Sequence, residues 1–182
     1  RHRLWHDEPR HTVLVFENES YPGWTHRRTV FFVDRAFLVL IDEAIGEPRG
    51  VLDLHFQLAP GPATIDATNR TAFSRSPEGG NVLVWAPKDS LIDLVEEMGQ
   101  TSSRFHVKEA RPAFAFRHRQ DHAALFLTVV APFRGDQPPV VRGRVPRVEA
   151  GANRIEAEVS MNGATWQVGR DLATGIGWSR RR

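Results

Sequence analysis

The sequence predicts an all-β fold, a two-layer antiparallel β-sandwich, and two observations carry that prediction. Apolar and polar residues alternate with a period of two in several segments, which is typical of half-buried strands. These segments are short, and turns rich in glycine and proline separate them. No long window of the chain shows a helical period. Many short strands joined by such turns are typical of a sandwich or a barrel.

Two neighbouring segments, residues 29–34 and 36–42, are apolar on both faces. This pattern is typical of central strands that a second layer covers. Asp34 and Arg35 interrupt the apolar stretch, and we expect them to form a hairpin turn. Asp42 is expected to close the second strand.

Later strands show clearer alternation. Residues 52–58 place apolar side chains on one face and a polar set that includes His55 on the other. Segments 123–133 and 153–161 alternate in the same way. Further short strands are expected near Val13–Phe16, Val82–Trp85, Ser90–Val95, Phe105–Val107, Ala113–Arg117 and Thr165–Val168.

The chain of 182 residues, 41% hydrophobic, is long enough for one domain with its own core. It has no internal repeat and no long linker, so residues 1–182 are expected to form a single β-sandwich domain. The longest apolar run, Ala36–Ile41, is far shorter than the ~20 residues of a membrane span. No leader is visible, and the start at Arg1 suggests a fragment or a processed product.

Charge and cysteine content exclude several functions. The net charge is only +2, and basic residues alternate with acidic ones, so we expect no nucleic-acid binding. The tail 180–182 is expected to be a solvated end. The absence of cysteine excludes disulfides and thiolate metal sites but leaves the cellular compartment open.

No metal site and no catalytic residue can be assigned from the residues alone. His6 with His11, and His118 with His122, have spacings that could bring two imidazoles together. Neither pair has the tight ligand spacing on a defined element that a zinc motif requires. The first pair falls in an N-terminal segment that looks frayed, and all four are expected to be ordinary surface or loop histidines. No serine lies in a Gly-flanked elbow, so no Ser-His-Asp set is indicated.

Candidate sugar contacts are more specific. His55 belongs either to a solvated strand face or to a row of hydrogen-bonding groups that a concave sheet presents to a sugar. Trp24, in an expected turn, is a candidate for stacking on a pyranose ring, whereas Trp85 and Trp166 are expected in the core. Tyr21, the one tyrosine, is expected in a turn, with a role as catalytic acid/base of a lyase as the alternative.

The order of motifs in the first part of the chain resembles the C-terminal β-sheet region of heparinase II/III-like polysaccharide lyases. A turn with Tyr21 precedes His-Arg-Arg at residues 26–28, which opens an apolar strand. A second strand ends in Asp42, and a later one closes on Phe-x-Leu-Ala-Pro at residues 56–60. The similarity spans roughly residues 21–135, and the order of the motifs is its main signal.

The resemblance implies an enzyme that cleaves uronic-acid-containing polysaccharide by β-elimination. Such lyases pair an N-terminal helical toroid with a C-terminal β-sandwich, and the active site lies between them. The family's catalytic groups and zinc ligands come from the toroid and from earlier strands. The resemblance therefore implies no catalytic residue and no cofactor in this chain, with zinc confined to the parent protein. The expected partners are an acidic polysaccharide and the protein's own N-terminal helical domain, with no nucleic acid and no membrane.

Arg27 and Arg28 are expected to cap the entry to a strand and to pair with acids on neighbouring strands. The alternative for Arg28 is a clamp on a uronate carboxylate, because guanidinium binds carboxylate bidentately. Arg28, His55 and Trp24 are thus the candidate substrate-binding residues. The alternative function is a non-catalytic carbohydrate-binding or structural module. The resemblance implies a periplasmic or secreted protein, and a cytoplasmic one stays open.

Overall fold

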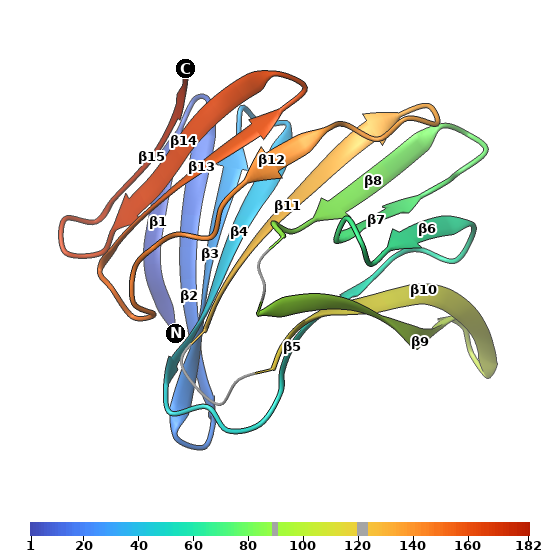
Figure 1. The fold of residues 1–182 in the computed structure, drawn as a ribbon, viewed down its shortest axis with the longest axis horizontal. Helices are drawn as coiled ribbons and strands as arrows, with labels where there is room; N and C mark the ends of the chain where they lie inside the picture. The colour runs from blue at the N-terminus through green and yellow to red at the C-terminus, as the bar shows by residue number, and fades with distance from the viewer. Residues whose placement is uncertain (89–90, 120–123) are drawn as a thin grey trace.

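The computed structural model describes residues 1–88, 91–119 and 124–182, and these residues form fifteen strands and no helix. The predicted antiparallel β-sandwich is confirmed (Figure 1). The strands are β1 (His2–Glu8), β2 (His11–Tyr21), β3 (Trp24–Val33), β4 (Phe37–Gly46), β5 (Leu52–Gln57), β6 (Ala63–Asp66), β7 (Thr71–Ser74), β8 (Gly80–Trp85), β9 (Ile92–Arg104), β10 (Val107–His118), β11 (Ala124–Arg134), β12 (Val141–Gly143), β13 (Arg154–Met161), β14 (Ala164–Asp171) and β15 (Ile176–Arg181).

Three antiparallel sheets make up the sandwich. The largest has eight strands in the order β1-β2-β3-β4-β11-β8-β7-β6. A four-stranded sheet, β12-β13-β14-β15, and a three-stranded sheet, β5-β10-β9, pack against it. Figure 1 shows the four-stranded sheet beside β1–β4 and the three-stranded sheet below β6–β8.

Alternate residues of the same strand enter two different cores, which shows that the eight-stranded sheet is covered on both faces. In β11, Leu127 and Val129 belong to the core shared with the four-stranded sheet. Phe126 and Ala124 of the same strand belong to the core shared with the three-stranded sheet. Because successive side chains of a strand point to opposite faces, the two cores lie on opposite sides of the sheet.

The two covering sheets are offset from each other. We call the core shared with the four-stranded sheet the first core and the one shared with the three-stranded sheet the second core. Among the described residues, no buried residue of the second core comes from β1, β2 or β3. On that face Trp5 and Phe16 are exposed. The four-stranded sheet covers this end of the opposite face instead, where Val13, Phe31 and their neighbours are buried. Each covering sheet therefore leaves part of one face of the large sheet open.

The predicted hairpin turn at Asp34 and Arg35 is confirmed. Both residues have positive φ, 48° and 55°, as a type I′ turn requires, and the amide of Ala36 donates to the carbonyl of Val33 at 2.9 Å. Asp34 also accepts a 2.7 Å hydrogen bond from the indole nitrogen of Trp166. The prediction that Trp166 lies in the core is confirmed too, because its indole is 6% exposed and its polar atom has a partner.

Several predicted strand ends are wrong. Asp42 does not close its strand, because β4 continues to Gly46. Phe105 and His106 form no strand but the turn between β9 and β10, with φ of 62° at His106.

At the end of the chain, the tail 180–182 is not a free solvated end. Its three residues are exposed, as expected, but Arg180 and Arg181 belong to β15, and Arg182 pairs with Glu158 at 3.1 Å. Trp85 is only half-buried, contacting the first core on one side. Ser90, in another expected strand, lies outside the described residues, and β9 begins at Ile92.

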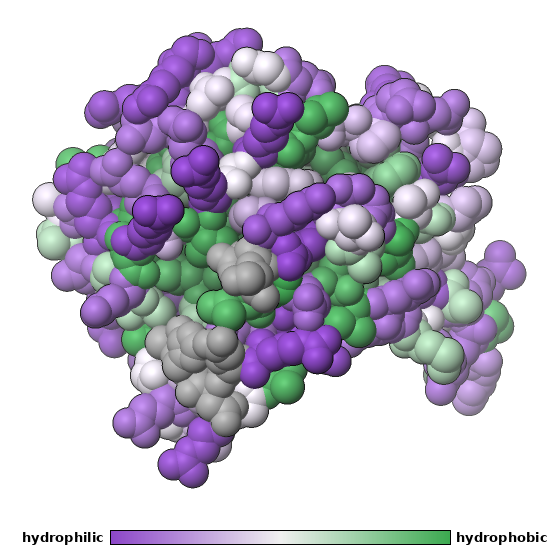
Figure 2. Space-filling model, viewed as in Figure 1, coloured by the Kyte–Doolittle hydropathy of each residue, from purple (hydrophilic) through white to green (hydrophobic). Residues whose placement is uncertain are grey.

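The surface has no single polar patch in the view of Figure 2, where hydrophilic residues spread over the visible face and hydrophobic ones show between them. In the described part of the chain, no helix has the length and apolar character that crossing a bilayer requires.

Candidate functional site

A pocket of about 380 Å³ lies where β5 meets the exposed part of the large sheet. We call it the histidine pocket. It brings together residues from β2, β3, β4, β5 with the residue before it, and β11. Its lining consists of Tyr21, Trp24, His26, Asp42, Glu43, Ala44, Val51, Leu52, Asp53, Leu54, His55 and Phe126.

The aromatic wall of this pocket comes from the tight turn between β2 and β3. Gly23, with φ of 80°, allows Tyr21 to pair directly with Trp24 across the turn. The two rings stack with centroids 4.3 Å apart and an interplanar angle of 16°. Tyr21 is the last residue of β2 and Trp24 the first of β3, so both flank the turn in which they were expected. An aromatic surface of this kind suits the apolar face of a sugar ring.

A buried carboxylate in the pocket wall holds two basic side chains, one that lines the pocket and one beside it. Arg28 of β3 lies opposite Asp42 of β4, and its Nε donates to Asp42 Oδ1 at 2.7 Å. His26 Nε2 lies 2.7 Å from the same oxygen. Asp42 is 2% exposed, and its Oδ2 has no hydrogen-bond partner among the described residues. Because a carboxylate oxygen only accepts hydrogen bonds, the short contact places a proton on Nε2 of His26.

Beside this group, β5 presents a second set of ionisable side chains. The carboxylate of Asp53 receives Nε and Nη2 of Arg117 at 2.8 and 2.7 Å. His55 Nδ1 lies 2.8 Å from Glu97 Oε2. One ligand atom each of Asp53, His55 and Glu97 lies within 4.8 Å of the others, a spacing that suits a divalent cation. Arg117 already occupies both oxygens of Asp53, so a cation there would displace an arginine. The expectation of no metal site stays a prediction.

The Asp53–Arg117 pair predicts a defined pH dependence. Hydrogen bonding by Arg117 holds the pKa of Asp53 below its usual value, although partial burial acts the other way. Because the folded pKa is depressed, the pair stabilises the fold above the ordinary aspartate pKa of about 3.9, and this stabilisation is lost as the pH falls through the lowered value. We expect Asp53→Asn to lower the free energy of unfolding at pH 7 by at most about 1 kcal/mol.

Urea unfolding at a series of pH values tests this expectation. The difference between Asp53→Asn and the parent should shrink toward zero as the pH falls below the ordinary aspartate pKa of about 3.9 and through the lowered pKa of Asp53. The exposed Asp136, replaced by asparagine, serves as the control and should show little difference at any pH. A difference for Asp53→Asn that is constant with pH would contradict the assignment.

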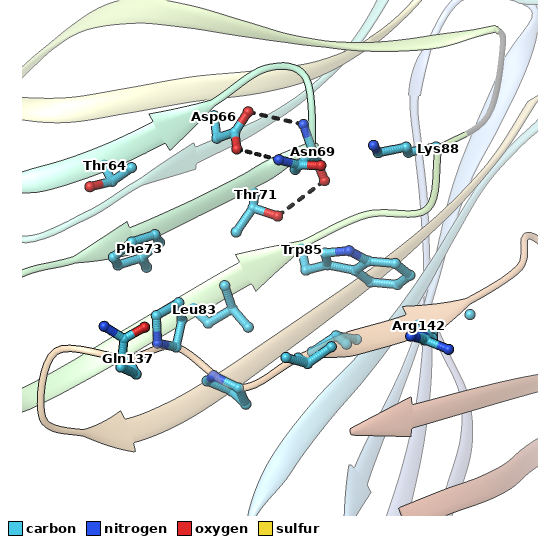
Figure 3. A pocket seen from close by; sticks show the side chains of 15 residues that line it. Thr64, Asp66, Asn69, Thr71, Phe73, Leu83, Trp85, Lys88, Gln137 and Arg142 are labelled. Carbon is cyan, nitrogen blue, oxygen red and sulfur yellow. Dashed lines mark hydrogen bonds between the residues drawn. The ribbon is translucent and has the colours of Figure 1, made fainter. Parts of the chain in front are cut away.

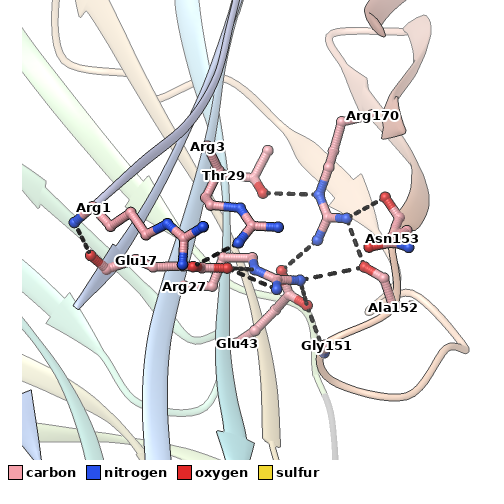
Figure 4. A network of polar contacts seen from close by, with 10 residues as sticks. All are labelled: Arg1, Arg3, Glu17, Arg27, Thr29, Glu43, Gly151, Ala152, Asn153 and Arg170. Atoms are coloured by element: carbon pink, nitrogen blue, oxygen red, sulfur yellow. Dashed lines mark hydrogen bonds and ion pairs between the residues drawn. The ribbon is translucent and has the colours of Figure 1, made fainter. Parts of the chain in front are cut away.

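Behind the pocket, on the other face of β3 and β4, lies a buried network of charges (Figure 4). Arg27 donates to Glu17 of β2 at 2.8 Å and lies 3.7 Å from Glu43 of β4. Glu43 in turn accepts from Arg170 of β14 at 2.6 Å. The prediction that Arg27 and Arg28 pair with acids on neighbouring strands is confirmed. Both lie inside β3, however, so they do not cap its entry.

Of the candidate substrate residues, Trp24 and His55 line the pocket, and Arg28 contacts its buried Asp42. Their roles stay predictions. Residue-level reasoning missed His26, whose position two residues before Arg28 on the same strand face was the available signal.

The histidine predictions were partly wrong. His6 and His11 lie in the ordered β1–β2 hairpin with ring centroids 6.0 Å apart, not in a frayed segment. His118, the last residue of β10, is buried at 4% exposure and is not a surface residue. His122 lies outside the described residues.

Residues 2–161 match the model of a protein family described as heparinase II/III-like, C-terminal. The chain belongs to this family. The heparinase II/III-like chain is 29% identical to a heparin-sulfate lyase of Bacteroides stercoris over 88% of its own length. It is 30% identical to the heparin-sulfate lyase of Pedobacter heparinus over 78% of its length.

The solved structures agree with the family assignment. The heparinase II/III-like chain superposes on heparan sulfate lyase HepC from Pedobacter heparinus with a TM-score of 0.85 and 27% identity, over 94% of this chain and 28% of the other. The chain spans about a quarter of the curated relatives it matches, 25% and 22% for the two named above. It corresponds to the C-terminal region of these larger proteins.

Proposed function

We propose that this chain forms the β-sandwich wall of a polysaccharide lyase that cleaves uronic-acid-containing chains by β-elimination. The observation that carries the proposal is the gathering of His26 and Arg28 on the buried Asp42, beside the stacked Tyr21–Trp24 pair. The relatives named as heparin-sulfate lyases support the same substrate class. Because the chain spans about a quarter of them, we infer that a separate N-terminal domain supplies the catalytic groups.

The chemistry of elimination explains why this arrangement suits it. Removal of the C5 proton places negative charge next to the uronate carboxylate, so a cation beside that carboxylate lowers the barrier. Arg28 uses Nε for Asp42, and its two terminal nitrogens have no partner among the described residues. They remain available to a carboxylate, with which guanidinium makes strong paired hydrogen bonds.

The remaining groups fit a sugar chain next to that clamp. Trp24 offers its ring face to a pyranose, and the second ring nitrogen of His26 offers a hydrogen-bonding group to a hydroxyl. The burial of Asp42 holds both basic side chains in place before substrate arrives, which reduces the cost of ordering them on binding.

Kinetics of the whole protein test the proposal. Arg28→Gln and the double variant Arg28→Gln/Trp24→Ala should lower kcat/KM on heparan sulfate, with product followed by its ultraviolet absorbance. Loss of one charge-assisted bond, worth about 1.5–3 kcal/mol, predicts roughly a 10- to 100-fold decrease for Arg28→Gln. Arg154→Gln, which removes an exposed arginine from β13, is the matched control and should leave kcat/KM unchanged.

Two results would reject the proposal. Unchanged kcat/KM in both pocket variants would remove the histidine pocket from the substrate path. A whole protein that binds acidic polysaccharide but yields no unsaturated product would favour the alternative, a non-catalytic binding module. The 182-residue chain alone is expected to release no unsaturated product.

A further inference from the structure

A second groove lies at the opposite end of the large sheet and on its other face, next to the edge of the four-stranded sheet. It has a volume of about 710 Å³ and opens between β6–β8 and the segment that leads into β12 (Figure 3). We call it the edge groove. It exists because the four-stranded sheet does not extend over this end of the eight-stranded sheet.

Strand register places the side chains of its floor on one face. Residues directly opposite each other on neighbouring strands point to the same side of a sheet. Two such rows line the groove, namely Asp66–Thr71–Trp85 and Thr64–Phe73–Leu83. The floor is therefore a band of polar groups beside aromatic and aliphatic ones.

Trp85 is the main apolar surface of the groove. It is half-buried, contacts the first core, and has no hydrogen-bond partner for its indole nitrogen among the described residues. Gly143 faces it from β12, and a Cβ at that glycine would lie 3.5 Å from the indole ring and 3.2 Å from Val159. The glycine keeps the strand close to the indole without a side chain over it. A flat ring with a free N–H donor matches the alternating apolar faces and hydroxyl edges of a sugar.

The polar groups beside Trp85 are fixed before any ligand arrives. Asp66 accepts from the backbone and side-chain nitrogens of Asn69 at 3.0 and 2.6 Å. The hydroxyl of Thr71 donates to the carbonyl of Asn69 at 3.1 Å. The two bonds from Asn69, with a smaller contribution from the charge of Lys88, also hold the pKa of Asp66 below its usual value, so this acceptor stays ionised. Groups held in this way lose little conformational freedom on binding.

Two exposed cations flank the indole. Figure 3 shows Lys88 on one side of Trp85 and Arg142 on the other. The side chain of Arg142 makes no ion pair or hydrogen bond with a described residue, and Lys88 shares the groove with the carboxylate of Asp66. The groove thus has an excess of positive charge around its aromatic floor.

We propose that the edge groove binds an acidic oligosaccharide, with a sugar ring on Trp85 and its carboxylate or sulfate groups between Lys88 and Arg142. This inference goes beyond the proposed function, because binding here requires no bond cleavage and uses the face opposite the histidine pocket. The site would hold a different stretch of polysaccharide from the one being cleaved.

The lysine content of the chain allows a direct test. Lys88 and Lys108 are the two lysines, and Lys108 lies on β10, away from the groove. Reductive methylation with ¹³C-formaldehyde gives each lysine its own NMR signal, and Lys88→Arg assigns them. On titration with a heparan sulfate hexasaccharide, the Lys88 signal should shift saturably and the Lys108 signal should not.

Variants identify the groove as the site. Arg142→Gln should weaken the Kd read from the Lys88 signal by about 5- to 10-fold, the effect of one charged contact. Arg144→Gln is the matched control, because it removes an exposed arginine just outside the groove lining and should change Kd less than 2-fold. Both positions are exposed, so neither change threatens the fold.

Four results would overturn the inference. Two concern the titration itself: no saturable shift of the Lys88 signal, or equal shifts of both lysine signals. The third is that neutral maltohexaose binds as tightly as the acidic hexasaccharide. The fourth is that Arg28→Gln abolishes the shift of the Lys88 signal. The last result would locate the saccharide in the histidine pocket. The proposed function is tested separately by turnover of the whole protein, so either can fail while the other stands.

Discussion

Replacing Arg170 with alanine is expected to lower the free energy of unfolding by about 3–5 kcal/mol, one of the two largest effects that we predict for the fold. Arg170 is fully buried and donates to Glu43 at 2.6 Å and to the carbonyls of Ala152 and Asn153 at 2.6 and 2.5 Å. Since β14 and β4 belong to different sheets, this guanidinium bonds the two layers together (Figure 4).

Most of this loss of stability is expected because the substitution leaves the buried charge of Glu43 without its main partner. Burial lowers the pKa of Arg170. The negative charge of Glu43 and its hydrogen bond act against that shift and stabilise the charged guanidinium. Without Arg170, Glu43 keeps a bond from the amide of Gly151 at 2.9 Å and the more distant Arg27, and its buried charge is poorly compensated. Breaking one partner of a buried pair is costly for this reason.

Guanidinium chloride unfolding measures this effect. The exposed Arg154, paired with Glu156, gives the matched control, and Arg154→Ala should cost less than about 1 kcal/mol. The double variant Arg170→Met/Glu43→Leu should be more stable than Arg170→Ala, because it removes both charges together. A loss below about 1 kcal/mol for Arg170→Ala would show that the buried network contributes little.

Phe116→Ala should also lower the free energy of unfolding by about 3–5 kcal/mol. Phe116 of β10 is fully buried in the core beneath the three-stranded sheet, opposite Leu54 of β5. Its ring centroid lies 5.8 Å from those of Phe56 and Phe114. The cavity left by the ring removes packing between β10 and β5, the strand that carries His55.

Hydrogen exchange together with chemical unfolding checks this prediction. Relative to the parent protein, Phe116→Ala should accelerate amide exchange in β5 more than in β2, because β2 packs in the first core and Phe116 in the second. Phe105→Ala is the control, because Phe105 is 90% exposed in the β9–β10 turn and should change stability by less than about 0.5 kcal/mol. Equal acceleration across both cores would contradict a local role for Phe116.

The sequence was sufficient to locate the turn between β3 and β4 but not the exact register of the two strands. A two-residue loop of Asp34 and Arg35 alone would put Arg28 opposite Ile41, whereas the observed loop also includes Ala36, so that Val33 pairs with Phe37 and Arg28 with Asp42. Alternation then places His26 on the same face. The prediction that Asp42 closes the second strand was wrong because β4 continues to Gly46, and apolar patterning does not reveal that the charged Asp42 and Glu43 are buried inside it.

The pairings that join distant parts of the chain could not be predicted. Alternation identifies the faces of a strand but not which sheet covers each face, so the half-burial of Trp85 and the burial of His118 depend on partners far away in sequence. The same holds for Arg170. A charged side chain is expected at the surface, and its burial is possible only because the fold pairs it with Glu43 of a distant strand.

The strand order of the large sheet also constrains how the chain acquires its structure. β1 to β4 are successive neighbours, so these strands can pair as soon as they are synthesised. The outer edge of β4, however, pairs with β11, where Ala44 meets Ala124. Until β11 leaves the ribosome, β4 presents an apolar strand with unsatisfied backbone groups to solvent. Closing so long a loop is slow, and during that interval β4 is the segment on which chaperone binding or aggregation should begin.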